Sequence, residues 1–232
     1  MLKLLWRCLL AAVALIAAAV LLYQIWILGH IWYWVDHNPG TSAFMLSRLE
    51  DLQSKKPQTE LKHQWIAYDR LSVHLKRAII AAEDARFLEH EGFDWESIQK
   101  AYEKNLKKGK IVAGGSTISQ QLAKNLFLSG RRSPWRKAEE AVITLMLEKM
   151  MDKQRILEIY LNIIEWGDGV FGAEAAARHY FGVSASALNR EQAARLAAIV
   201  PNPRFYDKNR NTRWLNRKTE MLLRNMEWTQ VP

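Results

Sequence analysis

The feature that most limits how this chain can fold is an apolar run near its start, from Cys8 to Gly29, in which Gln24 is the one strongly polar side chain. About twenty such residues in a helix, at ~1.5 Å each, are long enough to cross the hydrocarbon core of a bilayer. A cleaved signal peptide is the alternative, because Ala17–Ala19 could serve as a cleavage site. The apolar core of a signal peptide usually ends sooner than this run does, so the run predicts an uncleaved membrane anchor.

The residues on either side of the run indicate its orientation. Lys3 and Arg7 precede it, and the positive-inside tendency then leaves the N-terminus in the cytoplasm. The far end carries aromatic side chains suited to an interfacial belt, namely Trp26, Trp32, Tyr33 and Trp34. We therefore expect residues 1–35 to form a cytoplasmic stub and a single-pass transmembrane anchor, with the rest of the chain outside the cytoplasm and tethered to the membrane.

Beyond the anchor, the composition favours one folded domain. The 232 residues are 49% hydrophobic and 25% charged, which allows a packed core. The formal net charge of +9 is typical of nucleic-acid binding. Outside the cytoplasm, however, anionic lipid headgroups and phosphorylated substrates are the expected partners, and nucleic acid is not. The one cysteine, Cys8, excludes an intramolecular disulfide and a thiolate metal cluster.

Helix caps and apolar spacing predict a mainly α domain over residues 75–232, after a turn and a polar linker or N-terminal segment over 36–74. Thr117 and Gln120 form a capping-box pattern for a helix that ends near Phe127. Other helix starts are indicated at Ser133–Pro134, Asp152 and Asn189, and a last amphipathic helix is expected over about 212–228. Alternating β patterns are nearly absent, so little sheet is expected.

The first chemical motif, at 83–94, follows directly on an apolar segment. If the helix continued, Glu83, Phe87 and His90 would share one face. Glu83 is the acid closest to apolar surroundings, and partial desolvation raises the pKa of a carboxyl group toward the range useful for a general base. Two alternatives remain. One is an ordinary surface acid, and the other is a metal site from Glu83, His90 and Asp94, for which no second histidine lies at ligand spacing.

The second motif runs from Gly114 to Asn125. On a helix, Gln121, Lys124 and Asn125 share a face that offers hydrogen-bond donors and a cation. A glycine-rich entry into a helix, with free N–H groups, also suits a phosphate. A helix that is merely capped explains Thr117 but not this polar stripe.

The third motif lies at 130–142. Arg136 and Lys137 precede Glu140 by four and three residues, so both cations can reach its carboxylate and hold it ionised. Two carboxyl groups in unequal environments, Glu83 and Glu140, can divide acid–base work from electrostatic work. The simpler alternative for this motif is an exposed, ion-paired helix.

A fourth stretch, at 156–182, holds glycines at a turn and alanines suited to close helix packing, and it indicates architecture rather than chemistry. Together the four stretches resemble the peptidoglycan glycosyltransferases that polymerise lipid II, found in class A penicillin-binding proteins and as stand-alone enzymes. The resemblance covers about 78–203. It rests on Glu-Asp-x-x-Phe-x-x-His-x-Gly-x-Asp at 83–94, Gly-Gly-Ser-Thr-Ile-x-Gln-Gln-x-x-Lys-Asn at 114–125, Arg-Lys-x-x-Glu at 136–140 and Tyr-Leu-Asn at 160–162. Ser119 stands where the family usually has Thr, which keeps the hydroxyl group.

The resemblance implies a lysozyme-like α fold with a small membrane-facing jaw. It implies two catalytic carboxylates: Glu83, the base that deprotonates the acceptor's sugar 4-hydroxyl, and Glu140, which helps to stabilise the departing lipid pyrophosphate. The implied substrate-binding set is Asp84, Ser116, Gln121, Lys124, Asn125, Arg132, Arg136 and Lys137, with Ser116, Gln121 and Asn125 on the donor side. No cofactor is required, although a divalent cation (Mg²⁺ or Mn²⁺) at Glu140 stays open. The implied partners are lipid II, the growing glycan strand, the membrane, and penicillin-binding and division proteins.

Two rival functions remain from the sequence. A lytic, lysozyme-like glycosidase also uses carboxylates on this polymer, but it has little use for the cations around Lys124 and Arg136. A membrane-anchored scaffold for wall synthesis explains the anchor and the charge but gives no function to the four motifs. The Ser-x-x-Lys pattern at Ser97 and Lys100 is interpreted as coincidence, since no Lys-Thr-Gly follows and 232 residues leave no room for a transpeptidase domain.

Overall fold

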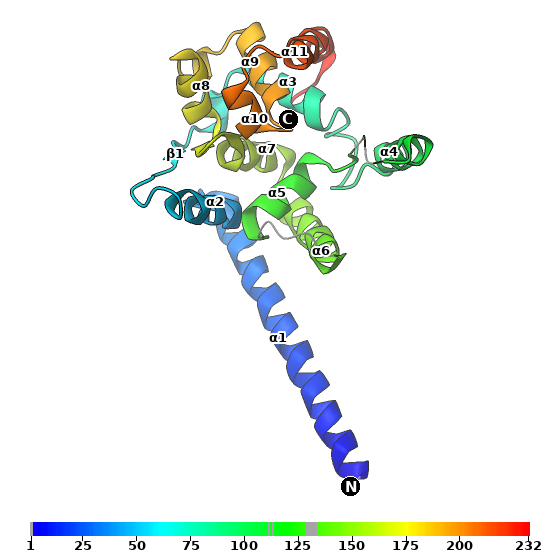
Figure 1. Ribbon diagram of the computed structural model, residues 1–232. Helices are drawn as coiled ribbons and strands as arrows, with labels where there is room; N and C mark the ends of the chain where they lie inside the picture. The colour runs from blue at the N-terminus through cyan, green and yellow to red at the C-terminus, as the bar shows by residue number, and fades with distance from the viewer. Residues whose placement is uncertain (1, 111, 113, 129–133) are drawn as a thin grey trace. The chain divides into compact units, whose positions relative to one another are not determined.

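The computed structural model describes residues 2–110, 112, 114–128 and 134–232. The chain forms two compact units, residues 1–38 and 39–232 (Figure 1). The first unit is one continuous helix, α1 (Leu2–Asp36). Its Leu and Ala residues are strong helix formers, and large apolar side chains such as Leu9, Val13 and Ile16 are exposed on it. By length and composition, α1 is a candidate membrane span.

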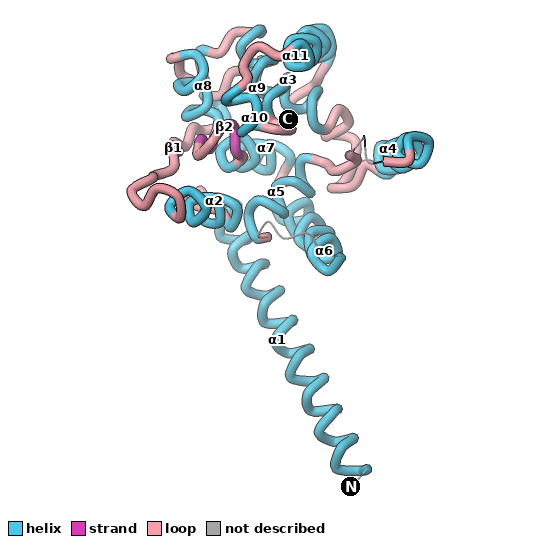
Figure 2. Tube along the Cα trace, in the orientation of Figure 1, coloured by secondary structure: helices cyan, strands magenta, loops and turns pink. Residues whose placement is uncertain are grey.

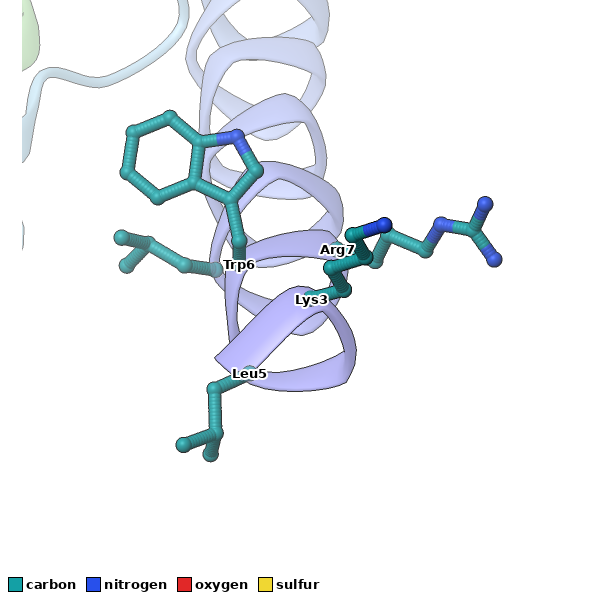
Figure 3. A pocket seen from close by; sticks show the side chains of 5 residues that line it. Lys3, Leu5, Trp6 and Arg7 are labelled. Atoms are coloured by element: carbon teal, nitrogen blue, oxygen red, sulfur yellow. The ribbon is translucent and has the colours of Figure 1, made fainter. Parts of the chain in front are cut away.

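A hollow of about 540 Å³ lies along the first turns of α1, and Figure 3 shows the side chains that line it. Its lining consists only of residues from that helix: Lys3, Leu5, Trp6, Arg7 and Leu9. The lining holds two cations and no carboxylate. This hollow is the flank of an apolar helix, and it brings together none of the residues predicted to do chemistry.

The second unit is mainly helical, as predicted. Its helices are α2 (Ala43–Gln53), α3 (Val73–Glu83), α4 (Trp95–Lys108), α5 (Ile118–Phe127), α6 (Pro134–Met150), α7 (Lys153–Ile163), α8 (Ala173–Phe181), α9 (Arg190–Ile199), α10 (Pro203–Lys208) and α11 (Arg213–Asn225), with 3₁₀ turns at Tyr68–Arg70, Ala185–Ala187 and Met226–Trp228. Figure 2 shows how helices dominate the described part of the chain.

A small sheet was not anticipated from the sequence. Its strands are β1 (Lys62–His63), β2 (Glu165–Gly167) and β3 (Val170–Phe171), in the order β1-β3-β2. β1 is parallel to β3, and β2 is antiparallel to β3. Strands of two or three residues are too short to show a period-two pattern, which is why the sequence did not reveal them.

The predicted helix starts are largely confirmed. Thr117 and Asn189 each form a complete capping box, with Gln120 and Gln192 as the reciprocal partners. Asp152 caps α7 by accepting a hydrogen bond from the backbone N–H of Arg155. α6 begins at Pro134, the predicted first helical position, whereas Ser133 lies outside the described residues.

The core of the second unit joins two groups of helices (Figures 1 and 2). α9 packs against α3 and α11, and α5 packs against α6, α7 and α2. The small buried side chains of α9, among them Ala194, Ala197 and Ala198, let α3 approach closely. On α3, Leu75 and Ile79 are fully buried. This packing fixes the C-terminal end of α3, where Glu83 lies.

Residues 39–74 belong to the second compact unit, so of the two descriptions given for 36–74, an N-terminal segment suits these residues better than a linker. The reason is a buried arginine. Arg48 of α2 donates from Nε to Glu165 Oε1 (3.1 Å) and from an Nη to Asp168 Oδ1 (2.8 Å). Arg48 and Glu165 are both buried, so these bonds tie α2 to the sheet from inside the unit.

Candidate active site

The first acidic motif is a turn, not the continuation of a helix. α3 ends at Glu83, and Asp84 is its extended C-cap, so the predicted shared face of Glu83, Phe87 and His90 is wrong. The physical reason is Asp84, which is buried. Its Oδ2 accepts a hydrogen bond from the backbone N–H of Ile118 (3.0 Å), and its Oδ1 bonds His90 Nε2 (2.9 Å). Asp84 therefore joins the acidic motif to the first turn of α5 and has both oxygens occupied.

The glycine-containing loop before α5 closes against the same turn. The hydroxyl group of Thr117 donates to the carbonyl of Gly92 (2.7 Å). A Cβ on Gly92, whose φ is +88°, would come within 2.7 Å of Thr144 Cγ2. A Cβ on Gly115 would lie 2.9 Å from the Cα of Ile98. Glycine at both positions permits the close approach that sets this loop beside Glu83.

Glu83 is held by a chain of two hydrogen bonds. Nε2 of Gln121 donates to Glu83 Oε2 (2.9 Å), and the hydroxyl group of Tyr160 donates to Gln121 Oε1 (2.9 Å). Burial raises the pKa of Glu83, while the Gln121 bond and the charges of Lys218 and Lys124 oppose that rise. The pKa of Glu83 thus moves upward, in the direction expected from the apolar segment, and this direction suits a general base.

The second carboxylate, Glu140, is also buried, with 4% of the residue exposed. Nζ of Lys137 donates to its Oε1. The alternative of an exposed ion-paired helix therefore does not hold at Glu140. Its buried carboxylate has a bound ammonium partner, unlike Glu83, whose partner is a neutral amide.

The negative charges of both carboxylates, Glu140 and Glu83, act on Lys124. Burial lowers the pKa of its ammonium group, the negative charge of Glu140 opposes this, and the positive charges of Arg136 and Lys137 add to it. Glu83 also acts on Lys124, more weakly than Glu140. A partly buried cation with several cations beside it is costly unless an anion balances it, so this cluster is suited to bind an anion.

The described residues do not by themselves form a site for a divalent cation. Glu140 is a single carboxylate surrounded by the cations Lys124, Arg136 and Lys137. Mg²⁺ and Mn²⁺ require several oxygen ligands, and no group of three or more His, Cys, Asp or Glu side chains within the described ranges could hold a metal ion. The predicted alternative of Glu83, His90 and Asp94 as ligands is not assembled either.

Two hollows flank Gln121 and Glu83. The first, of about 230 Å³, is lined by Gln121, Lys124, Asn125 and Tyr160, and further by Phe44, Ile164, Glu165 and residues 200–204. The second, of about 170 Å³, is lined by residues 81–85, Asp94, Ser97 and 114–117. Ser116 thus lies in a different hollow from Gln121 and Asn125, with which the resemblance grouped it. Arg132 lies outside the described residues.

Two residues near Glu83 were not assigned to the site from the sequence. Tyr160 was placed in a stretch interpreted as architecture, yet its hydroxyl group reaches Gln121 across 39 positions. Lys218 was given no role from the sequence, yet its charge acts on Glu83. No local sequence pattern indicates that these two side chains come close to the site, because their positions depend on how α7 and α11 pack.

The comparisons with known proteins agree with the four motifs. The model of the Transglycosylase family matches residues 50–227. The biosynthetic peptidoglycan transglycosylase of Methylobacillus flagellatus is 66% identical over 230 residues, 99% of each chain. That of Nitrosospira multiformis is 66% identical over 93% of this chain and 94% of its own, and that of Chromobacterium violaceum is 62% identical over 97% and 99%. The chain belongs to the Transglycosylase family, as its motifs predicted, and its mainly helical domain is the lysozyme-like fold of that family.

Proposed function

We propose that the chain polymerises lipid II into glycan strands, with Glu83 as the general base and the cations around Glu140 as the leaving-group site. The observation that supports this proposal is Lys124, a partly buried cation on which the charges of both carboxylates act. A group suited to acid–base chemistry and a group suited to anion binding would then be neighbours. Polymerisation from a lipid pyrophosphate needs both.

In the proposed step, Glu83 removes the proton from the 4-hydroxyl of the acceptor sugar. The freed oxygen forms a bond to the anomeric carbon of the donor, while the bond from that carbon to the pyrophosphate oxygen breaks. The electron pair leaves with polyprenyl diphosphate, whose charge Lys124 and Arg136 stabilise. Lys137 and Glu140 position those cations, since Lys137 is bonded to the buried Glu140.

The hollow lined by Gln121, Lys124 and Asn125 is proposed for the donor, because the cation Lys124 is part of its wall. The hollow lined by Asp94, Ser97 and residues 114–117 is proposed for the acceptor, because Glu83 and Asp84 line it directly. Asp84 then acts by holding the turn, since both of its oxygens are bonded within the protein. Ser116 belongs to the acceptor side in this assignment.

The same proposal places the chain in the inner membrane. α1 anchors it, residues before Cys8 lie in the cytoplasm, and residues 39–232 lie in the periplasm, with a small jaw facing the bilayer. The basic N-terminal flank supports this orientation. Penicillin-binding and division proteins are the proposed partners. Reporter domains fused after Pro232, one active only in the periplasm and one only in the cytoplasm, test the orientation.

The test of function is the purified full-length chain with labelled lipid II in vesicles, with products resolved by length. A polymerase gives strands from lipid II and leaves purified glycan strands intact. A lytic glycosidase would shorten those strands and make none from lipid II. A scaffold would do neither, and it would still support assembly of the wall-synthesis machinery after loss of Glu83 and Glu140.

A further inference from the structure

Tyr160 has a hydroxyl group that the proposed chemistry does not yet use. The residue is fully buried on α7. Within the described part of the chain, the acceptor recorded for its O–H is Oε1 of Gln121, at 2.9 Å. A buried hydroxyl hydrogen without an acceptor is costly. Tyr160 therefore favours the orientation of Gln121 in which the carbonyl oxygen of the amide faces α7.

That orientation decides what Glu83 faces. With Oε1 turned to Tyr160, Nε2 is turned to Glu83 and donates to its Oε2 at 2.9 Å. An amide N–H stabilises a carboxylate, because an ionised carboxyl group only accepts hydrogen bonds. In the opposite orientation, the amide oxygen would face Glu83 and would be satisfied only by a protonated carboxyl group. The hydroxyl hydrogen of Tyr160 would then lose its acceptor.

We propose that Tyr160 is a positioning residue for this reaction: its O–H fixes the amide of Gln121 so that an N–H faces Glu83 and keeps that carboxyl group able to accept a proton. The inference rests on the proposed role of Glu83 as the base. It assigns to α7 a part in catalysis that neither the motif spacing nor the family comparison supplies.

The other charges around Glu83 give the expected direction of a test. Lys124 on α5 and Lys218 on α11 favour the ionised form, whereas Asp84 and burial oppose it. Gln121 is the neutral group on the favourable side. If Tyr160 loses its O–H, the amide is free to turn, and the pKa of Glu83 rises further. Since a base must be deprotonated to act, turnover is then lost at a higher pH than in the unmodified chain.

The experiment is the pH–rate profile of Tyr160→Phe in the full-length chain, with labelled lipid II. We expect the acidic limb to move up by about one pH unit, the scale of one hydrogen bond to a charged group. At pH values below the acidic limb, turnover then falls about tenfold. At pH values above the limb, turnover stays close to that of the unmodified chain. Tyr180→Phe is the matched control, because its hydroxyl donates to the carbonyl of Trp166 (2.7 Å). That control removes a Tyr hydroxyl bond without moving the limb.

Gln121→Met supplies a second route to the same result, because it removes the amide while keeping the length of the side chain. It should move the limb in the same direction, and the double variant should move it no further, since both changes break one chain of bonds. A loss of turnover that is equal at every pH, an unmoved limb, or additive shifts would each overturn the role of Tyr160.

Glu83→Gln in the same assay separates the two proposals. If it still polymerises, the base assignment fails together with this inference, and if it is inactive while Tyr160→Phe leaves the limb in place, only this inference fails.

Discussion

Replacing Glu83 by Gln removes a base while changing little else in the site. The amide oxygen of the new side chain can still accept the hydrogen bond from Gln121 Nε2 that Glu83 accepts now. A general base contributes roughly 10²–10⁴-fold to a rate, or about 3–5 kcal/mol of transition-state stabilisation. We expect turnover to fall by that factor while lipid II or a phosphoglycolipid inhibitor still binds, since the cations near Glu140 are untouched.

The assay is product length and rate on labelled lipid II, with binding measured in parallel. Glu89→Gln is the matched control, because Glu89 lies in the same motif but is exposed and paired with Arg86 (2.7 Å). Near-normal polymer from Glu83→Gln, or equal losses from both variants, would refute the role of Glu83 as base. Loss of binding together with turnover would instead indicate a collapsed site.

The same substitution should also change how the stability of the fold depends on pH. The pKa of Glu83 is raised in the folded chain by burial, so the folded state holds its proton to a higher pH than the unfolded state does. Stability therefore falls as pH rises from the unfolded pKa through the folded one. Glu83→Gln lacks this loss, so it should melt at a higher temperature than the unmodified chain at neutral pH, and the advantage should vanish in acid.

Three further predictions concern the cations, the buried arginine and the anchor. Lys124→Ala and Arg136→Ala should each remove about 2–4 kcal/mol of transition-state stabilisation, the scale of a lost oxyanion donor, and turnover should fall accordingly. Lys107→Ala and Lys108→Ala, at exposed positions of α4, should change turnover little. Equal mild effects at all four positions would count against a pyrophosphate site. Arg48→Ala should lower the free energy of unfolding by about 3 kcal/mol, because it removes the closer cation from the buried Glu165 and leaves only the longer ion pair with Arg204 (3.6 Å). Arg190→Ala, which breaks the exposed pair with Glu227, should cost about 0–1 kcal/mol in the same denaturation experiment. Deleting residues 1–35 should leave a folded chain that polymerises more weakly, since the compact unit of residues 39–232 is retained; loss of helical circular dichroism would contradict this.

Interactions between near neighbours in the sequence were predictable, and long-range ones were not. Thr117, Asp152 and Asn189 cap their helices through bonds to residues three positions on, so their pattern is visible in the sequence. The end of α3 at Glu83 was missed because the bond from Ile118 that holds Asp84 spans 34 positions. The inclusion of residues 39–74 in the domain was missed for the same reason, since Arg48 and Glu165 are 117 positions apart.

The candidate site follows this division. The residue types were present in the motifs, and the raised pKa of Glu83 could be expected from the apolar segment before it. The arrangement of Ser116 and Gln121 in separate hollows could not be predicted, because it depends on how the loop at Gly115 closes against Ile98 of α4. Motif spacing identified which groups do chemistry, and tertiary packing decided which of them face each other.

The placement of Lys124 links the two halves of the proposed reaction. Its ammonium group is disfavoured by burial and by the neighbouring charges of Arg136 and Lys137, and Glu140 only partly offsets this. A pyrophosphate bound there would add negative charge next to all three cations, so its binding would favour the ionised form of Lys124. The charge that forms as the leaving group departs is larger than the charge it carries while bonded to sugar. The same cations therefore stabilise the transition state more than the bound substrate, and that difference is what accelerates a reaction.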